Sequence, residues 1–152
     1  MIIRYAELSD IDELLGLYKR FHAEVQESYG IPFDEDTLME RIAGIIQNHV
    51  GWVMEEEGKL VGVMGGIVTS MLFDKNTKVF MEVSWYVTPE FRRHGMKMLE
   101  TAQKYCMDLK VQRMIIGHMG NADRDRFEKV YARKGFELFE QHYIKELKYE
   151  DR

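Results

Sequence analysis

The feature that most constrains the fold is a change in the spacing of apolar residues near position 50. Within 11–25 and 38–49, apolar side chains recur every three or four residues, which is the spacing of amphipathic helices. Within 51–55 and 79–87, short apolar runs rich in valine and aromatic residues are typical of strands. The sequence therefore predicts two helices that are followed by a strand-rich segment.

The other expected elements follow from the same patterns and from helix-end signals. Ser9 is the predicted N-cap of the first helix, and Gly135 is a predicted left-handed C-cap. The remaining expected elements are strands over 1–6, 60–69 and 113–117, helices over 95–109 and 123–134, and one or two strands over 136–147. This order predicts a mixed α/β fold, with a central sheet of six to seven strands and helices on both faces.

Three glycines interrupt the strand expected over 60–69. Gly62, Gly65 and Gly66 weaken a strand interior, so they predict a bulge or the close approach of another backbone. We found no linker or internal repeat, and the 152 residues fit one domain over 1–152.

Composition narrows the function classes. A formal charge of −5 disfavours nucleic-acid binding through a broad basic face. The lone cysteine, Cys106, excludes an internal disulfide and a cysteine-based zinc site, so we expect it in the core and expect no metal. Neither a signal peptide nor an apolar run long enough for a membrane helix is evident, which predicts a soluble, cytoplasmic protein.

Residues 89–98, PEFRRHGMKM, place several potential cations around one glycine between an expected strand and an expected helix. A helix start offers unpaired N–H groups and a partial positive charge, and together with a glycine it suits a phosphate group. The nucleotide-binding motifs G-x-x-x-x-G-K-[ST] and G-x-G-x-x-G are both missing from the chain. From these residues alone, an anion site and a solvated loop that merely caps a helix remain equal alternatives.

Two motifs resemble those of the GNAT family of N-acetyltransferases. Residues 83–95, VSWYVTPEFRRHG, resemble the family's strand ending in Val-x-Pro-Glu-(Tyr/Phe)-Arg that leads into [Arg/Gln]-x-x-Gly-x-[Gly/Ala]. Residues 131–136, YARKGF, resemble the downstream Tyr-x-x-x-Gly-Phe, and the order of elements also matches. The resemblance covers nearly the whole chain and implies a GNAT-like domain that uses acetyl-CoA (coenzyme A) as acyl donor.

The resemblance also implies where the cofactor is held. In this family the loop wraps the pyrophosphate of acetyl-CoA, so the implied contacts are Arg92, Arg93, His94, Gly95, Met96, Lys97 and Met98. The strand end at Tyr86 and Val87 is expected to pair its backbone with the pantetheine amides. For that pairing, the strand must separate from the next one near 115–117.

The implied reaction is direct attack of an amine on the thioester. Tyr131 is the implied general acid, although it could instead simply pack on the helix face it shares with Phe127. Glu82 is the candidate base, against the alternative of a solvent-exposed carboxylate on the sheet. Period-two alternation puts Glu82, Ser84 and Tyr86 on one face unless a bulge intervenes, and Ser84 is a weaker candidate for orienting a water.

Two positions depart from the family pattern. Lys97 replaces the usual Gly or Ala, so it either pairs with a phosphate or crowds the loop. Arg124 stands where relatives often carry an asparagine, and Asn121 is expected to cap the helix instead. These departures keep a non-catalytic acyl-CoA-binding module as an alternative. A toxin that acetylates aminoacyl-tRNA is a third reading, which the acidic charge disfavours.

The acceptor is expected to be a small-molecule or peptide amine, held by the first two helices and the loop between them. The residues of interest there are Tyr29, Phe33, Asp34, Glu35 and Asp36. This acidic cluster hints at a cationic amine, but acidic residues at a helix start are already explained by the helix dipole. Pairing of the terminal strands between two copies makes a homodimer another expectation.

Overall fold

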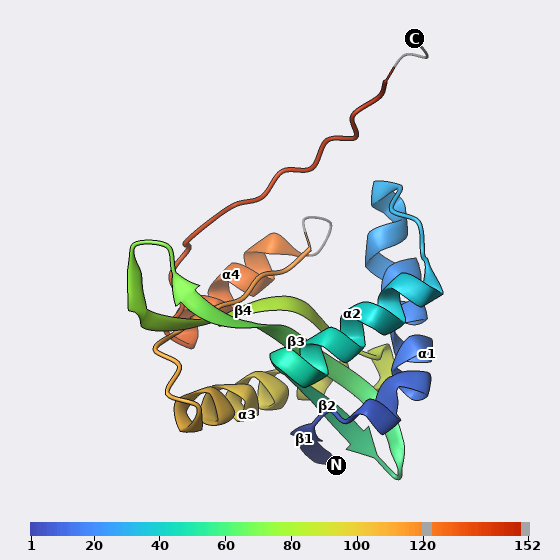
Figure 1. Cartoon of the computed structure of the whole chain (residues 1–152), viewed down its shortest axis with the longest axis horizontal. Helices are drawn as coiled ribbons and strands as arrows, with labels where there is room; N and C mark the ends of the chain where they lie inside the picture. Colours follow the sequence, from blue (N-terminus) through green and yellow to red (C-terminus); the bar gives the residue numbers. More distant parts are fainter. Residues whose placement is uncertain (120–122, 150–152) are drawn as a thin grey trace. The chain divides into compact units, whose positions relative to one another are not determined.

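The structure, a computed structural model, describes residues 1–119 and 123–149 in two compact units that divide before Asp123. The first unit contains the strands β1 (Ile2–Tyr5), β2 (Val50–Glu56), β3 (Lys59–Met71), β4 (Asp74–Val87) and β5 (Arg113–Ile115). Its helices are α1 (Ile11–Phe21), α2 (Glu35–Asn48) and α3 (Gly95–Asp108), and the second unit contains α4 (Arg124–Arg133) (Figure 1). The expected order of elements is confirmed up to α4.

The sheet is mixed and has the strand order β1-β2-β3-β4-β5. Neighbouring strands are antiparallel from β1 to β4, and β5 runs parallel to β4. The prediction of six to seven strands is wrong, because the described residues form five and none lies within 136–149. That segment has the composition of a strand, but a strand needs a partner for its backbone hydrogen bonds, and composition does not supply one.

Helices lie on both faces of the sheet, as predicted. On β2, Trp52 stacks on Tyr105 of α3 with ring centroids 6.0 Å apart. The next residue, Val53, joins a buried cluster with Leu14 of α1 and Ile42 of α2. Because successive strand residues point to opposite faces, α1 and α2 cover one face and α3 covers the other.

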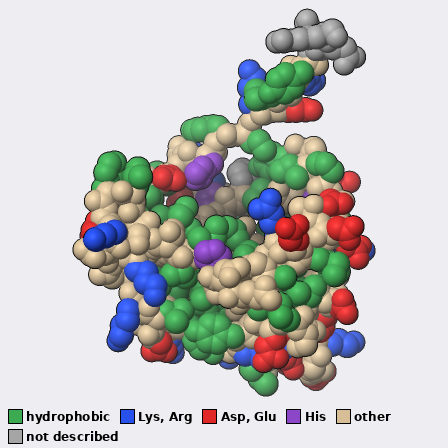
Figure 2. All heavy atoms as spheres, in the orientation of Figure 1, with side chains coloured by type: hydrophobic (Ala, Val, Ile, Leu, Met, Phe, Trp, Pro, Cys, Tyr) green, Lys and Arg blue, Asp and Glu red, His purple; other side chains and the backbone are tan. Residues whose placement is uncertain are grey.

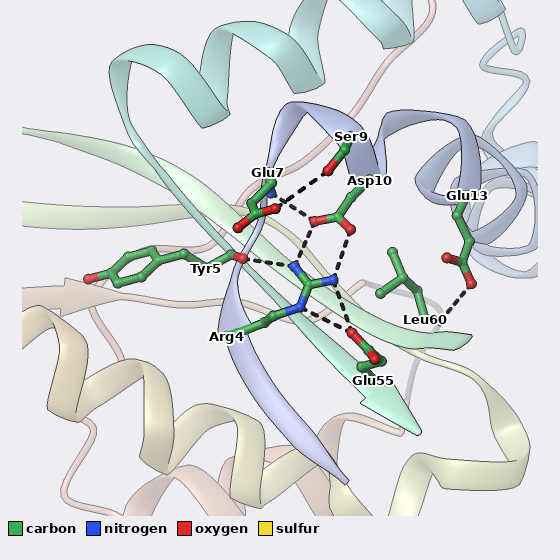
Figure 3. Close-up of polar contacts among 8 residues, drawn as sticks. All are labelled: Arg4, Tyr5, Glu7, Ser9, Asp10, Glu13, Glu55 and Leu60. Carbon is green, nitrogen blue, oxygen red and sulfur yellow. Dashed lines mark hydrogen bonds and ion pairs between the residues drawn. The ribbon is translucent and has the colours of Figure 1, made fainter. Parts of the chain in front are cut away.

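An arginine ties the first strand to the first helix and to β2 (Figure 3). Arg4 donates from Nη1 and Nη2 to the two oxygens of Asp10, at 2.8 and 2.9 Å, and from Nε to Glu55 at 3.1 Å. We call Arg4, Asp10 and Glu55 the N-terminal corner. The Glu7 N–H also donates to Asp10, at 2.8 Å, so this carboxylate holds both the arginine and the chain that enters α1.

The prediction that Ser9 caps the first helix is wrong. A 3₁₀ turn, Leu8–Asp10, precedes α1, and Glu7 rather than Ser9 occupies the N-cap position of that turn. The Ser9 hydroxyl lies 3.4 Å from Glu7 Oε2 and caps no N–H group. The physical reason is the hydrogen-bond network around Arg4, which joins Asp10 to Glu55 of β2. This network holds the chain in a 3₁₀ turn before α1 begins.

The glycines of β3 serve the close approach that the sequence predicts. The register of β3 against β4 shifts between Gly65 and Gly66. A Cβ atom built on Gly66 would lie 2.3 Å from the carbonyl oxygen of Met81 and 2.6 Å from the Phe80 ring. No side chain fits in that space, so the bulge in this part of the sheet depends on glycine.

In the second unit, Asp123 caps α4 by accepting from the Arg126 N–H at 3.2 Å. Asn121, the expected cap, lies outside the described residues. Gly135 follows the helix with φ of 83°, which confirms the predicted left-handed C-cap. Arg124 pairs with Glu128 one turn later, at 2.7 Å. Across 1–119 and 123–149, no helix has the length and apolar character that crossing a bilayer requires.

Candidate functional site

The end of β4 is an open strand edge. β5 pairs only with residues 79–81 of β4, so the edge over 82–87 has no strand beside it among the described residues. The Thr88 N–H donates to the Val61 carbonyl at 2.9 Å, toward β3. Because backbone groups of successive strand residues point to alternate sides, those of Val87 point away from β3, toward the open edge. Among the described residues, the two strands therefore separate where the family resemblance implies.

A basic turn follows directly. Residues Pro89–His94 form a 3₁₀ helix, and α3 begins at Gly95. The side chains of Arg92, Arg93 and Lys97 are exposed, which places three cations around the start of a helix. Met98, in contrast, is fully buried, so its side chain packs in the core and only its backbone faces this turn.

Gly95 has ordinary helical geometry, with φ of −56° and ψ of −40°. A Cβ atom placed there would come no closer than 3.9 Å to its nearest neighbour, the Trp85 ring. The protein itself therefore does not require glycine at this position. A larger side chain here would instead extend over the start of α3.

Arg92 is held by three groups of the protein. Its Nη2 lies 2.7 Å from Glu24 Oε1, and its Nε and Nη2 donate to the Val87 carbonyl at 3.2 and 3.1 Å. Its guanidinium carbon lies 5.7 Å from the centre of the Tyr86 ring. The Tyr86 hydroxyl donates to the other oxygen of Glu24 at 2.8 Å. We call Arg92, Glu24 and Tyr86 the strand-end cluster.

Tyr86 is itself buried. Its pKa is raised to about 12, first by burial and then by the Glu24 carboxylate that accepts a hydrogen bond from its hydroxyl. Its ring stacks on Phe21 of α1, with centroids 5.2 Å apart. Ser84 lies on the same face, as alternation predicts, and its hydroxyl oxygen is 2.6 Å from the Tyr18 hydroxyl oxygen.

Glu82 lies at the start of the open edge. Burial raises the pKa of its carboxyl to about 7, and the Gly117 N–H, which donates to it at 3.0 Å, opposes that rise. The bulge intervenes here, because Ser84 pairs with Gly65 while Glu82 pairs with Gly66. Alternation therefore does not decide which face Glu82 takes. The Glu82 side chain is partly buried and accepts one backbone hydrogen bond, and this burial is the cause of its raised pKa.

Tyr18 is a polar residue of this region that lies within the helical spacing of 11–25. Burial raises the pKa of its hydroxyl to about 12, and the negative charge of Glu82 adds to that rise. Tyr18, Ser84 and Glu82 therefore share one electrostatic environment at the base of the open edge. The signal in the sequence was Ser84, a hydroxyl between Val83 and Trp85 in this strand.

Tyr131 lies on α4 in the second unit. Its ring packs between Phe127 and Phe136, with centroids 5.8 and 6.0 Å away. These ring contacts are those of the packing alternative, and the acid role of Tyr131 stays a prediction. The turn after the helix is fixed by the Phe136 N–H, which donates to the Tyr131 carbonyl at 3.0 Å.

Acidic side chains gather over α1 and α2 (Figure 2). Several already have structural partners. Asp34 caps α2 by accepting from the Thr37 N–H at 2.9 Å, and Glu35 lies 3.3 Å from Lys19 Nζ. Phe33 contacts His22, with ring centroids 5.4 Å apart. Helix capping explains Asp34, and an ion pair with Lys19 explains Glu35.

The Cys106 thiol and the potential metal ligands of the described residues form no second candidate site. Cys106 is buried, and burial raises the pKa of its thiol to about 11, so it packs in the core as predicted. Within the described ranges, no group of three or more His, Cys, Asp or Glu side chains is arranged to hold a metal ion.

Comparisons with known proteins give a family and a fold. The sequence model described as the acetyltransferase (GNAT) family matches residues 11–136. No curated protein matches the chain. The solved structure of a probable acetyltransferase aligns over 100% of both chains, with 19% identity and a TM-score of 0.73.

Two further solved structures are similar. One is AAC(6')-Iy in complex with the bisubstrate analogue CoA-S-monomethyl-acetylneamine, with 16% identity, a TM-score of 0.72 and coverage of 97% of each chain. The other is the ribosomal-protein-alanine N-acetyltransferase of Brucella melitensis biovar Abortus 2308, with 12% identity and a TM-score of 0.70. That alignment covers 97% of this chain and 100% of the other. At these identities the structural likeness establishes the fold.

Proposed function

The chain belongs to the acetyltransferase (GNAT) family of acyl-CoA-dependent enzymes, and from that premise we propose that it transfers the acetyl group of acetyl-CoA to a primary amine by direct attack. The observation that carries the proposal is the open edge of β4 over 82–87, which ends in a cationic turn at the start of α3. We propose one catalytic domain over 1–152, because the family match over 11–136 runs through both units.

The residues present fit an acyl-CoA. An open strand edge can pair with the amides of an extended ligand arm as it would with another strand. Beyond that edge, three exposed cations and a helix start suit a diphosphate, and the position of Gly95 leaves room for it. When bound, acetyl-CoA supplies an activated thioester.

The proposed contacts follow the chain from the strand to the helix. Val87 offers its backbone at the open edge, whereas the backbone groups of Tyr86 point toward β3 and Tyr86 takes part through its side chain in the strand-end cluster. The turn offers the groups of Arg92, Arg93, His94, Gly95, Met96, Lys97 and, through its backbone only, Met98. Lys97 is exposed, whereas Met98 fills the core, which supports a phosphate-pairing ammonium over one that crowds the loop. Each of Arg93 and Lys97 can then act as a point of anion contact.

Glu82 is the proposed base and Tyr131 the proposed acid. A carboxyl with a pKa of about 7 is half ionised at neutral pH and can accept the proton that the acceptor ammonium must lose. Tyr131 would return a proton to the sulfur that leaves. The tuned pKa of Glu82 favours a catalyst over a non-catalytic acyl-CoA-binding module, which needs no such group.

The test measures transfer of the acetyl group from acetyl-CoA to each amine of a panel. The release of free thiol reports the reaction. The panel includes an aminoglycoside, a peptide with a free α-amine, a polyamine, lysine and a charged tRNA, because relatives of this fold include an aminoglycoside and a ribosomal-protein acetyltransferase. We expect thiol release with at least one small-molecule or peptide amine. Binding of coenzyme A without thiol release from any amine would favour the non-catalytic module. No binding at millimolar acetyl-CoA would refute the proposal.

We also propose that two copies associate through the C-terminal segment 136–149. Leu138, Tyr143 and Leu147 are 73%, 91% and 65% exposed, although apolar and aromatic side chains favour burial. Light scattering after gel filtration measures the mass directly. A monomer at micromolar concentration would contradict this part of the proposal.

A further inference from the structure

We propose that Glu24 is a positioning residue for acyl-CoA binding. Through Arg92 and Tyr86, this carboxylate holds the end of β4 and the turn after it in the shape that receives the ligand's diphosphate. The inference rests on the proposed function, because it concerns the same site. Nothing in the family motif includes Glu24, which lies outside 83–95 and before the open edge in the sequence.

The first step of the argument is the geometry around the guanidinium. Arg92 uses Nη2 for Glu24 and both Nε and Nη2 for the Val87 carbonyl. A guanidinium is planar and rigid, so contacts on two adjacent nitrogens fix its orientation. The carbonyl that it holds belongs to the last residue of β4. Arg92 therefore connects the strand to the turn in which it lies.

The second step is that Glu24 uses both of its oxygens in the cluster. One oxygen accepts from Arg92 at 2.7 Å, and the other accepts from the Tyr86 hydroxyl at 2.8 Å. Tyr86 in turn lies below the guanidinium, so the three side chains form a closed set of contacts. A charged acceptor makes stronger hydrogen bonds than a neutral one. Loss of the charge on Glu24 would loosen both partners at once.

The third step is the place of Glu24 in the chain. It lies in a single turn of π-helix, His22–Gln26, that follows α1. Such turns are rare, and they are found frequently at functional sites. Here the turn belongs to the segment before α2, on the side where the acceptor is expected. The cluster therefore links the acceptor side of the domain to the diphosphate turn.

A second ion pair joins the same two regions and provides a matched control. Arg20 of α1 lies 3.1 Å from Glu90 of the turn, but these side chains are 49% and 62% exposed. An exposed pair is screened and contributes little. Neither of these residues touches the Val87 carbonyl in the described contacts. We therefore expect that loss of the Arg20 pair leaves ligand binding nearly unchanged.

The experiment measures the dissociation constant of coenzyme A by calorimetry for the wild type, Glu24→Gln, Glu90→Gln, Arg92→Met and the double variant Glu24→Gln/Arg92→Met. We expect Glu24→Gln to weaken binding about fivefold to tenfold, a typical coupling between two sites. Glu90→Gln should change it less than twofold. If Glu24 acts through Arg92 and Tyr86, the double variant loses less affinity than the sum of the two single losses, because only the Tyr86 contact is left for Glu24→Gln to disturb.

Kinetics and hydrogen exchange separate positioning from a general loss of stability. Glu24→Gln should raise the KM for acetyl-CoA with kcat little changed, and Glu24→Asp should restore part of the affinity. By reciprocity, coenzyme A bound to the wild type should slow amide exchange within 22–29. That measurement needs no variant, so it decides the question even if Glu24→Gln does not fold.

The outcomes are distinct from those that test the function. Failure of the wild type to bind coenzyme A would refute both the function and this role. Normal binding by the wild type with equal or tighter binding by Glu24→Gln would overturn the positioning role and leave the function standing. Unchanged exchange within 22–29 on binding, or additive losses in the double variant, would overturn it as well.

Discussion

Two arginine–carboxylate clusters in the first unit have similar chemistry and different surroundings. In the N-terminal corner, Arg4 is 32% exposed and the Asp10 side chain is 9% exposed, and all three guanidinium nitrogens donate to carboxylates. In the strand-end cluster, Arg92 is 50% exposed and Glu24 is 34% exposed. There, one carboxylate, one carbonyl and one aromatic ring hold the arginine.

The difference in exposure between the two clusters indicates different roles, one in stability and one in ligand binding. The Arg4 guanidinium holds the pKa of the Asp10 carboxyl below its usual range, which means that the corner stabilises the folded state wherever Asp10 is ionised. Arg92 retains solvent-exposed area at an open strand edge, next to a helix start. The closed corner therefore holds the fold together, whereas the open end leaves charge and backbone groups available to a ligand.

The largest expected effect is at the open end. Gly95→Glu should weaken coenzyme A binding by at least about a hundredfold, because it adds both bulk and a negative charge where a diphosphate binds. Calorimetry measures the affinity. The control is Gly95→Ala, whose Cβ has ordinary contacts and which should fold at least as stably. If Gly95→Glu and the wild type bind coenzyme A with equal affinity, the proposal that the diphosphate binds at this turn is wrong.

The next effect is at the closed corner. Arg4→Met should lower the free energy of unfolding by about 2–3 kcal/mol, because it leaves Asp10 buried without its counterion. Urea denaturation measures the loss, and coenzyme A affinity should stay the same. Arg20→Met, which breaks an exposed pair, should cost less than about 1 kcal/mol. If Arg4→Met loses affinity for coenzyme A but keeps its stability, the N-terminal corner serves binding and not stability, which would contradict the comparison.

Glu82 should make the open end sensitive to pH. Its folded-state pKa of about 7 lies above the ordinary 4.5, so its contribution to stability is present below pH 4.5 and is lost as pH rises through 7. Relative to the wild type, Glu82→Gln should therefore gain stability by up to about 3 kcal/mol as pH rises from 4.5 to 8. The same variant should lose the rise of activity with pH near 7.

Denaturation at several pH values, with the exposed Glu40→Gln as control, measures this difference. Glu40→Gln removes an exposed carboxylate and therefore controls for the loss of one negative charge. A Glu82→Gln variant that is equally stable at every pH would mean that Glu82 is solvated. If Glu82→Gln has the same pH–rate profile as the wild type, Glu82 is not the general base.

The smallest expected effect is at the base of the open edge. Tyr18→Phe removes a hydroxyl that lies 2.6 Å from the buried Ser84 hydroxyl, and it should cost about 1 kcal/mol of stability. The double variant Tyr18→Phe/Ser84→Ala should recover part of that loss, because neither partner is left unpaired. Urea midpoints measure both variants. Additive losses would show that the two hydroxyls act independently.

The local patterns of the sequence predicted much of the fold. Helical spacing, strand composition and the glycines of 60–69 are properties of neighbouring residues, so they predicted the element order, the bulge and the left-handed Gly135. They could not identify the partner of 136–149 or the absence of a strand there, because strand pairing depends on distant residues. Ser9 failed as a cap because Asp10 accepts from Arg4 and from the Glu7 N–H, and these bonds accompany a 3₁₀ turn before α1.

The candidate site divides in the same way. The sequence by itself determined the basic turn, the glycine at its centre and the two motifs by which the family is recognised, because these residues are close together in the chain. Only the tertiary structure decided that Met98 faces the core, that Glu82 is buried enough to hold a pKa of about 7, and that Glu24 holds Arg92. Burial and ion pairing depend on which distant residues the fold brings together, and no local pattern records that.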